Sequence, residues 1–365
     1  MAEEPRIVTY FRSMKKLRAA TLHVKVGLPP MMRVGEDLRS TQATPLSDEE
    51  VRSIVYEILN DAQKKEFQAA GDLDFAYEIE NRERFRVNVY RQRGRITVVA
   101  RRVQTEIPTV ESLTLPSAIE KVATSRQGLV LVTGTTGCGK STTLAAMIGW
   151  INRNRRCSIV TIEDPIEYVY EDDKAVINQR EINIDVPSFR EALKHILRQD
   201  PDVIMIGELR DSESFQAGLS AAETGHLVFG TLHSANVAQT MSRILEFFPP
   251  DRETQIRRML AFNMRAILSQ KLLPSTNKEK GMVPAVEILL STPTVRKLIQ
   301  ESRDRDLPEA IRADSETGMQ DFNQSLADLV RRNLVDRKTA MSYSDNPEAL
   351  QRELSGIVAK GGLVG

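Results

Sequence analysis

The segment GLVLVTGTTGCGKSTTLAAM, residues 128–147, decides the fold of this 365-residue chain. Its centre fits the pattern G-x-x-x-x-G-K-[ST], which begins at Gly134 and ends at Lys140 and Ser141. An apolar run precedes the glycines and a helix-forming run follows them, which is the strand–loop–helix context that a phosphate-binding loop requires. The alternative is a chance glycine-rich turn, and the full pattern in this context disfavours it.

The chemistry of such a loop is specific. Glycines let backbone N–H groups turn toward phosphate oxygens, and the following helix adds its positive N-terminal end. Lys140 would place its ammonium on the β and γ phosphates, while the Ser141 hydroxyl would ligate Mg²⁺. We therefore expect ATP and Mg²⁺ as cofactors, with nine consecutive residues around the nucleotide: Gly134, Thr135, Thr136, Gly137, Cys138, Gly139, Lys140, Ser141 and Thr142. Redox sensing by Cys138 is an alternative to an incidental small residue, which we favour.

The composition is that of a folded protein with two or more domains, with 41% apolar and 27% charged residues. A formal net charge of zero argues against bulk nucleic acid or an anionic membrane as the main partner. The two cysteines, Cys138 and Cys157, imply no disulfide framework. The sequence contains neither a signal-peptide pattern nor an apolar run of the ~20 residues that span a bilayer, so we expect a cytoplasmic protein.

Residues 1–103 predict a small α+β domain. Helical spacing over residues 47–67 is followed by two alternating segments, 84–90 and 96–101, with a hairpin turn between them. The pattern then lapses around two prolines, which places an interdomain linker at residues 104–116.

Residues 117–365 predict the ATPase domain, in which apolar strands alternate with helical patterns. The short and almost unbroken apolar strands suit a parallel sheet covered on both faces. The strand candidates are residues 129–133, 158–162, 203–206 and 227–232. From about residue 251 onward the pattern is mainly helical.

Two strand ends carry carboxylates. Glu208 follows the strand at 203–206, and ligands of such folds lie at the carboxyl ends of the strands. We expect Glu208 to orient, or accept a proton from, the water that attacks the γ-phosphate. Gly207 stands where the usual Walker-B aspartate is expected, so Glu163 is our candidate for holding a Mg²⁺-bound water. Solvated acids at strand ends are the simpler alternative.

Two of the four histidines flank the strand candidate at 227–232. His233 follows the strand and therefore lies on the ligand side, where a hydrogen bond could report the γ-phosphate. For His226 a structural and a functional role remain equally open.

Eight arginines lie between residues 82 and 102. On sequence alone we favour a solvated sheet face. The two alternatives are nucleic-acid binding and an arginine finger presented across a subunit boundary.

In this order, the phosphate loop, the acidic segment at Glu163, the Gly207–Asp211 motif and the histidine segment resemble the secretion ATPases of type II and type IV pilus systems. More narrowly, the chain resembles the type IV pilus retraction ATPases of the PilT/PilU family. Residues 22–34, 178–181 and 294–301 fit the same family, although Thr294, Lys297 and Gln300 depart from its C-terminal motif.

The resemblance implies an α/β fold class, with a RecA-like P-loop ATPase domain preceded by a smaller PAS-like α+β domain, and a ring-shaped homohexamer. Arg86 and Arg101 match family positions that reach a neighbour's nucleotide, and Arg102 is an alternative to Arg101. The candidate site residues are therefore catalytic Glu208, Glu163, His233, Arg86 and Arg101, and metal-binding Ser141 and Glu163.

The sequence thus indicates a hexameric ATPase that powers type IV pilus retraction at the inner face of the inner membrane. Its expected partners are a platform protein of that membrane and, as a further candidate, a paralogous retraction ATPase; no nucleic acid is expected. One alternative is a nucleotide-binding accessory subunit of a partner motor. Another is a pilus assembly or type II secretion ATPase, which two cysteines disfavour because such relatives carry a tetracysteine zinc module. A nucleic-acid translocase is disfavoured by the zero net charge.

Overall fold

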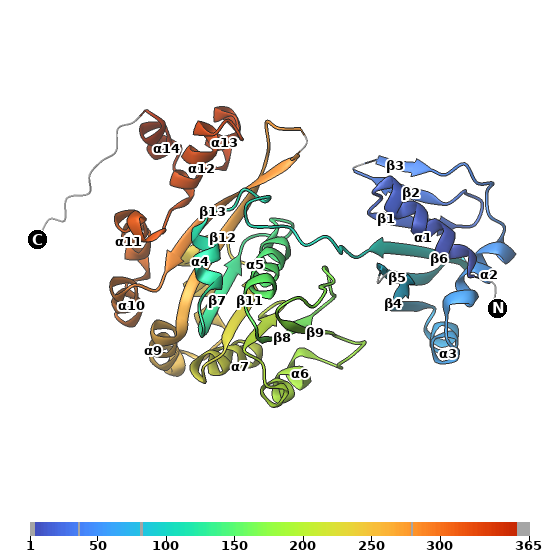
Figure 1. The fold of residues 1–365 in the computed structure, drawn as a ribbon, viewed down its shortest axis with the longest axis horizontal. Helices are drawn as coiled ribbons and strands as arrows, with labels where there is room; N and C mark the ends of the chain where they lie inside the picture. The colour runs from blue at the N-terminus through green and yellow to red at the C-terminus, as the bar shows by residue number, and fades with distance from the viewer. Residues whose placement is uncertain (1–3, 36, 81–82, 279, 356–365) are drawn as a thin grey trace, which may run out of the picture. The chain divides into compact units, whose positions relative to one another are not determined.

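The computed structural model describes residues 4–35, 37–80, 83–278 and 280–355. The chain divides into two compact units, one of Met1–Glu106 with Glu167–Val169, the other of Ile107–Ile166 with Tyr170–Gly365 (Figure 1). Each unit has its own sheet. Within the described ranges, none of the helices combines the length and apolar character needed to cross a bilayer.

The first unit is an antiparallel sheet in the order β3-β2-β1-β6-β5-β4, with three helices packed on it. On β5 and β6 the inward side chains alternate with polar ones, as expected for a sheet with one covered face. Phe11 of α1 stacks on Phe85 of β5 with ring centroids 4.1 Å apart. The elements are α1 Arg6–Leu17, β1 Thr21–Lys25, β2 Met31–Val34, β3 Asp37–Ser40, α2 Asp48–Ile58, α3 Asp61–Ala70, β4 Asp72–Ile79, β5 Glu83–Gln92 and β6 Arg95–Arg102.

Helical spacing over residues 47–67 predicted one helix, and the structure contains two. The chain leaves α2 at Leu59, which is extended, and α3 begins after Asn60. The Asn60 side chain accepts from the backbone N–H of Gln63, and the Gln63 side chain accepts from that of Asn60. This capping box starts a new helix inside the apolar pattern, because it satisfies backbone donors that a continuous helix would have bonded internally.

The predicted hairpin in the same unit is confirmed. Strands β5 and β6 pair antiparallel from Phe85–Arg102 to Gln92–Arg95. Arg93 and Gly94 form the turn, with φ of 51° and 76°. Two positive φ values in a two-residue loop match the twist of the strands that the loop connects.

The second unit is built on a seven-stranded sheet in the order β13-β12-β7-β11-β10-β8-β9, in which only β13 runs antiparallel to its neighbour. All four predicted strands are present at its centre. The strands are β7 Gly128–Thr133, β8 Ser158–Glu163, β9 Val176–Glu181, β10 Val203–Ile206, β11 Leu227–Leu232, β12 Met264–Pro274 and β13 Met282–Leu290.

Helices cover both faces of this sheet. On one face α6–α9 share a core with alternate residues of the central strands, such as Leu129 and Leu131 of β7. On the other face α5 contacts β7 and α4 (Figure 1). The helices are α4 Ala118–Ala123, α5 Lys140–Asn154, α6 Phe189–Ile196, η2 Leu197–Gln199, α7 Ser212–Glu223, α8 Val237–Glu246, η3 Pro250–Arg252, α9 Glu253–Asn263, α10 Pro293–Gln300, η4 Asp304–Asp306, α11 Leu307–Ala313, η5 Ser315–Thr317, α12 Phe322–Arg331, α13 Arg337–Tyr343 and α14 Pro347–Leu354.

The region after residue 251, which the sequence pattern indicated as mainly helical, also supplies two strands of the main sheet. Strands β12 and β13 pair over nine residues, from Ala266–Leu290 to Pro274–Met282. One end of this hairpin shares a small core with α12–α14, which lie beside it in Figure 1. The pattern was misread because both strands are buried on their two faces and therefore show no polar alternation.

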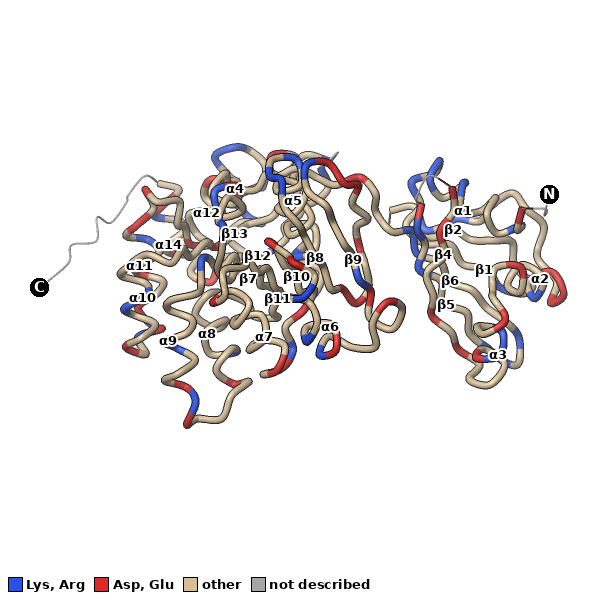
Figure 2. Tube along the Cα trace, turned by 60° about the horizontal axis from the view of Figure 1, so that its bottom comes forward, with Lys and Arg blue, Asp and Glu red and all other residues tan. Residues whose placement is uncertain are grey.

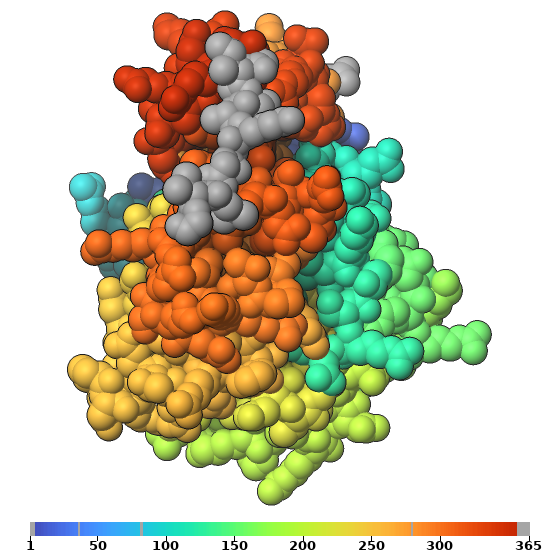
Figure 3. Space-filling view, turned by 90° about the vertical axis from the view of Figure 1, so that its left-hand side faces the viewer, coloured from blue at the N-terminus to red at the C-terminus, as the bar shows by residue number. Residues whose placement is uncertain are grey.

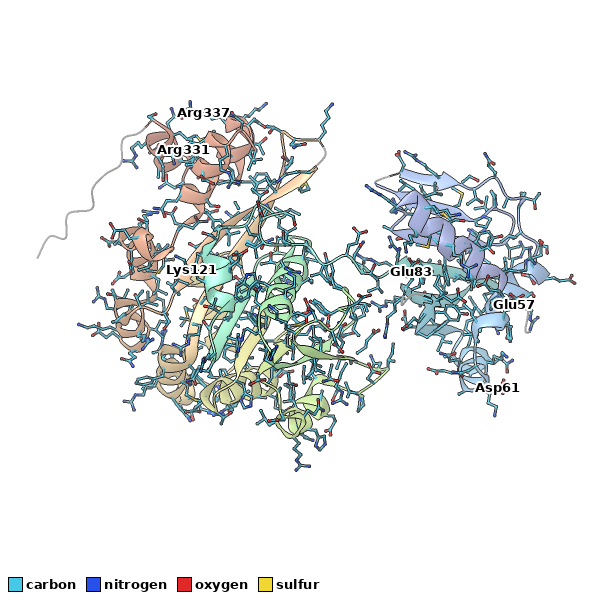
Figure 4. All side chains as sticks on the ribbon, in the orientation of Figure 1. Glu57, Asp61, Glu83, Lys121, Arg331 and Arg337 are labelled. Carbon is cyan, nitrogen blue, oxygen red and sulfur yellow. The ribbon has the colours of Figure 1, made fainter. Side chains whose placement is uncertain are left out.

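The last three helices are joined by polar contacts as well as by apolar packing. Arg331 of α12 donates to the carbonyl of Glu353, and Arg337 of α13 donates to Gln351, so both arginines bind α14 (Figure 4). On the molecular surface the C-terminal helices, orange to red, lie beside the teal segment that contains α4 (Figure 3). The two hydrogen bonds hold α14 against α12 and α13.

Glu287 is a buried carboxyl group in the middle of β13. It accepts a 2.7 Å hydrogen bond from the backbone N–H of Val237, the first residue of α8. The pKa of Glu287 is raised from 4.5 to about 7, chiefly by burial and also by the carboxylates of Asp321 and Asp345, against the lowering effects of the Val237 N–H and Lys271. The group thus holds the start of α8 against the sheet and is neutral in acid.

We predict that Glu287→Gln removes a pH dependence of stability. A raised native pKa means that the carboxyl group contributes stability below pH 4.5 and loses it as the pH rises through about 7. Relative to the variant, the wild-type free energy of unfolding should therefore fall by roughly 3 kcal/mol between pH 4.5 and pH 8. Urea unfolding at a series of pH values measures this difference, and parallel curves for the two proteins would contradict it.

Candidate phosphate-loop active site

The predicted phosphate loop lies between β7 and α5, as the motif requires. Gly134, Gly137 and Gly139 have φ of 146°, 78° and 90°, which side chains rarely tolerate. Gly134 is also sterically constrained, because a Cβ there would lie 2.4 Å from Cys138 Sγ and 2.5 Å from the Gln270 carbonyl oxygen. Lys140 opens α5 and its Nζ donates to the carbonyls of Gly134 and Thr135 at 2.9 and 3.0 Å. The lysine therefore lies over the loop.

Cys138 is a structural member of this loop. Its side chain is 4% exposed, and burial raises the pKa of the thiol, outweighing the opposite effect of Lys140. A buried, protonated thiol reacts slowly with oxidants. The geometry therefore favours the incidental small residue over the redox sensor.

A pocket of about 220 Å³ opens beside the loop and the first turn of α5. Its walls come from the loop and α5, from residues 112–114 within the predicted linker, and from the β12–β13 hairpin. The lining residues are Ser112, Leu113, Thr114, Gly139, Thr142, Thr143, Gln270, Leu272, Lys280, Met282 and Pro284. Lys280 closes one side by donating to the Thr114 hydroxyl. Sequence reasoning found only the Gly139 and Thr142 part, since the other walls depend on which strands become neighbours.

Glu208 follows β10 and is held by two cationic or polar neighbours. Its Oε2 lies 2.7 Å from a guanidinium nitrogen of Arg210, and its Oε1 lies 3.3 Å from Nε2 of His233, after β11. The hydrogen bond to Glu208 is the main cause of a raised pKa of Arg210. Glu208 and His233, each expected at the end of a strand, thus lie within reach of each other, and Arg210 is a further neighbour that the sequence analysis did not single out.

Gly207, in the Walker-B aspartate position, lies against the neighbouring strand end. A Cβ on Gly207 would be 3.2 Å from the Ile162 carbonyl oxygen and 3.4 Å from Glu163 Cα, and its N–H already bonds that carbonyl. A larger side chain would have to displace backbone. The glycine therefore brings β8 and β10 together where the two acidic segments lie.

Glu163 ends β8 and is 6% exposed. Its Oε1 accepts from the Thr161 hydroxyl at 2.8 Å and from the Gln179 amide at 3.1 Å. Neighbouring polar groups thus fix this carboxylate, which a solvated acid at a strand end would not require. Across the described residues no group of three or more His, Cys, Asp or Glu is arranged to hold a metal ion.

The two histidines of the sequence analysis lie at opposite ends of β11. His233 reaches Glu208, whereas His226 precedes the strand, where its Nδ1 lies 2.9 Å from the Ala221 carbonyl oxygen and 3.2 Å from the Thr224 hydroxyl. His226 therefore holds the turn after α7. Since parallel strands place their ligands at the carboxyl ends, this position favours the structural role.

Arg86 and Arg101 lie in the first unit, on neighbouring strands. They face each other in the register of β5 and β6, on the side of the sheet opposite its core. Arg86 pairs weakly with Asp74, at 3.6 Å, and both arginines are exposed or half exposed. Lys and Arg are interspersed with Asp and Glu along the described trace (Figure 2). Arg82, from the same arginine run, lies outside the described residues.

Comparison with known proteins now identifies the chain. The family model described as "Type II/IV secretion system protein" matches residues 71–303, from the residue before β4 to the residue before η4. The chain belongs to the type II/IV secretion system protein family. The predicted fold class is confirmed: a RecA-like P-loop ATPase unit follows a smaller α+β domain.

Members of this family resemble the chain over almost its whole length. The type IV pilus retraction ATPase PilT of Pseudomonas aeruginosa is 41% identical over 91% of this chain and 96% of its own. The type IV pilus ATPase PilU of the same organism is 40% identical over 93% of this chain and 89% of its own. The crystal structure of the pilus retraction motor PilT with bound ADP matches with a TM-score of 0.87 and 38% identity, over 96% of this chain and 100% of that one.

We predict that Gly134→Ala weakens ADP binding by at least ~10-fold, because the new methyl group would displace the loop or the Gln270 backbone. Gly225→Ala is the matched control, since Gly225 also has a positive φ, of 105°, but a Cβ there has nothing within 4 Å. Both variants carry backbone strain, and only the first disturbs the loop. Calorimetric titration with ADP separates them; equal affinities would contradict the steric argument.

Proposed function

We propose that the chain is a hexameric, Mg²⁺-dependent ATPase that powers retraction of a type IV pilus. The main support for this proposal is the geometry of the site. Lys140 lies over the phosphate loop, and Arg210 and His233 hold Glu208 at the ends of the neighbouring strands β10 and β11. The near full-length likeness to PilT and PilU supports retraction as the task of that site.

The nucleotide would lie across the loop and the adjoining pocket. The glycine N–H groups and the positive end of α5 favour the phosphates, and the Lys140 ammonium adds a point charge. The partly apolar pocket beside Gly139 has a suitable position for the nucleoside. Such a pose would use all nine loop residues expected from the sequence.

The residues present also fit Mg²⁺, which binds through one or two protein oxygens, phosphate oxygens and waters rather than a cage of carboxylates. Ser141 would supply the direct ligand from α5, and Glu163 would hold a metal-bound water from β8. When bound, the ion neutralises phosphate charge. The fixed orientation of Glu163 by Thr161 and Gln179 supports this role.

Glu208 is the proposed base. Its contacts to Arg210 and His233 fix the carboxylate at the ends of β10 and β11, and each oxygen retains a lone pair that could accept from water. From this position Glu208 would orient the attacking water, and His233 would respond to the γ-phosphate through the same carboxylate. Arg86 and Arg101 would complete a neighbouring subunit's site as arginine fingers.

As a motor the protein would act at the cytoplasmic face of the inner membrane, on the platform protein of the pilus machinery. A paralogous retraction ATPase is a further candidate partner. The likeness to PilU, beside that to PilT, favours one second function, namely an accessory subunit that binds nucleotide but depends on a partner motor for turnover.

Steady-state ATP hydrolysis by the purified protein tests the enzyme assignment. Glu208→Gln should lower kcat by at least ~100-fold with a small change in KM, because it removes the base and keeps the contacts of a similar side chain. Lys140→Ala should instead weaken nucleotide binding. Wild-type protein that binds ATP tightly and turns it over negligibly would favour the accessory subunit. Unchanged kcat in Glu208→Gln would exclude this residue as the base.

A mixing experiment tests whether Arg86 acts between subunits. Arg86→Ala and Lys140→Ala should each be inactive alone, because each lacks one half of every site. In a random one-to-one mixed hexamer, about a quarter of the sites would combine an intact loop with an intact arginine, so hydrolysis should return. Arg101→Ala is tested in the same way. Co-expressed, doubly tagged complexes without any recovered activity would contradict action in trans.

A further inference from the structure

Gln270 of β12 lies directly beneath the phosphate loop. Strand β12 runs parallel to β7 with Ser269 opposite Thr133, so Gln270 adjoins the first loop glycine. The Ser269 and Thr133 hydroxyls are 2.8 Å apart and close the last rung of the pairing. The Gln270 side chain is 3% exposed.

Both ends of the Gln270 amide are bonded, one to the loop and one to the helix after it. Nε2 donates to the Cys138 carbonyl oxygen at 2.6 Å, and Oε1 accepts from the Thr143 hydroxyl at 2.8 Å. Thr143 is itself 1% exposed. Because the Cys138 carbonyl oxygen can only accept a hydrogen bond, the NH₂ group must face the loop, and the Thr143 hydroxyl holds the amide oxygen on the other side.

The loop also rests on Gln270 sterically. A Cβ on Gly134 would lie 2.5 Å from the Gln270 carbonyl oxygen, and one on Gly139 would lie 2.8 Å from its Nε2. Two of the three motif glycines thus leave room for the same residue. Close approach of the loop to β12 is therefore part of the loop's shape.

The hydrogen bond to Cys138 has a consequence for the nucleotide. In a planar trans peptide the carbonyl and the following N–H point in opposite directions. Since Gln270 holds the Cys138 carbonyl toward β12, the Gly139 N–H is directed away from β12, to the side on which a phosphate would lie. A loop of this kind binds phosphate through such backbone donors.

We propose that Gln270 is a positioning residue that sets the Cys138–Gly139 peptide so that the Gly139 N–H donates to a nucleotide phosphate. The inference rests on the proposed function, because it requires that the loop bind a phosphorylated nucleotide. Gln270 also lines the pocket proposed for the nucleoside, but its amide acts on the phosphates through the loop. Thr143 acts one step further away, by fixing the orientation of the amide.

Three variants of the full chain test this role. Gln270→Glu replaces the NH₂ donor by an acceptor, and Gln270→Met removes both polar groups without adding charge. Thr143→Val removes only the hydrogen bond to the Gln270 amide oxygen and leaves the donor to Cys138 in place. Gln320→Glu is the matched control, because the Gln320 amide donates in the same way, at 2.7 Å, to the Val286 carbonyl on β13.

The measurements are the affinities for ADP and for adenosine, together with kcat and KM for ATP. We expect Gln270→Glu and Gln270→Met to weaken ADP binding by about 10- to 100-fold and to raise KM for ATP. Adenosine affinity should fall much less, because adenosine has no phosphate for the Gly139 N–H to bind. Thr143→Val should give a smaller loss in the same direction. Gln320→Glu should bind ADP as the wild type does.

Several outcomes would overturn the proposal. Wild-type ADP affinity in both Gln270 variants would show that the loop holds its shape without the amide. Equal losses of ADP and adenosine affinity would indicate collapse of the pocket instead of a misdirected phosphate donor. Should a Gln270 variant fail to fold, Thr143→Val with unchanged ADP affinity would have the same force. Wild-type protein without affinity for ADP would instead remove the proposed function itself.

Discussion

The parallel pairing of β7 with β12 is the contact on which the active site depends. It places β12 beside the strand that leads into the phosphate loop and brings the Gln270 carbonyl oxygen close to Gly134. The loop is therefore supported from below by a strand that lies more than a hundred residues away in the sequence. Glycine backbones can adopt many conformations, and the contacts with β12 select one of them for the loop.

The same hairpin of β12 and β13 contacts other parts that surround the site. Glu287 binds the first N–H of α8, shortly after His233 in the chain. A series of hydroxyl–hydroxyl hydrogen bonds also connects β12 with the segment after His233; its members are Ser269, Thr133, Thr240 and Ser234. On its other side, Lys271 binds Asp345 and the Tyr343 carbonyl. Hydrogen bonds thus connect the hairpin both to the phosphate loop and to the C-terminal helices.

The carboxylates Glu163 and Glu208 lie at the ends of two neighbouring strands, β8 and β10, which pack closely. Gly207 permits β10 to approach the end of β8, which brings the backbone of the Glu208 segment against that of Glu163. The Arg210 guanidinium pairs with Glu208 and so neutralises part of the negative charge of the two neighbouring acidic segments. At the position of the missing Walker-B aspartate, a Cβ would lie 3.2 Å from the Ile162 carbonyl oxygen, so a side chain there would be tightly packed.

The sequence by itself determined the P-loop, the four central strands and the order of the acidic and histidine segments, because each depends on local pattern: glycine spacing, apolar runs and strand-end polarity. It also placed Glu208 and His233 at the carboxyl ends of two strands, and in the structure these strands are neighbours. It did not reveal β12 and β13, because fully buried strands lack the alternation of apolar and polar residues. Nor did it reveal Gln270 and Arg210, because their roles depend on the residues that they contact in the folded chain. Only the tertiary structure decided which strand adjoins the loop, as that choice depends on packing between segments remote in the chain.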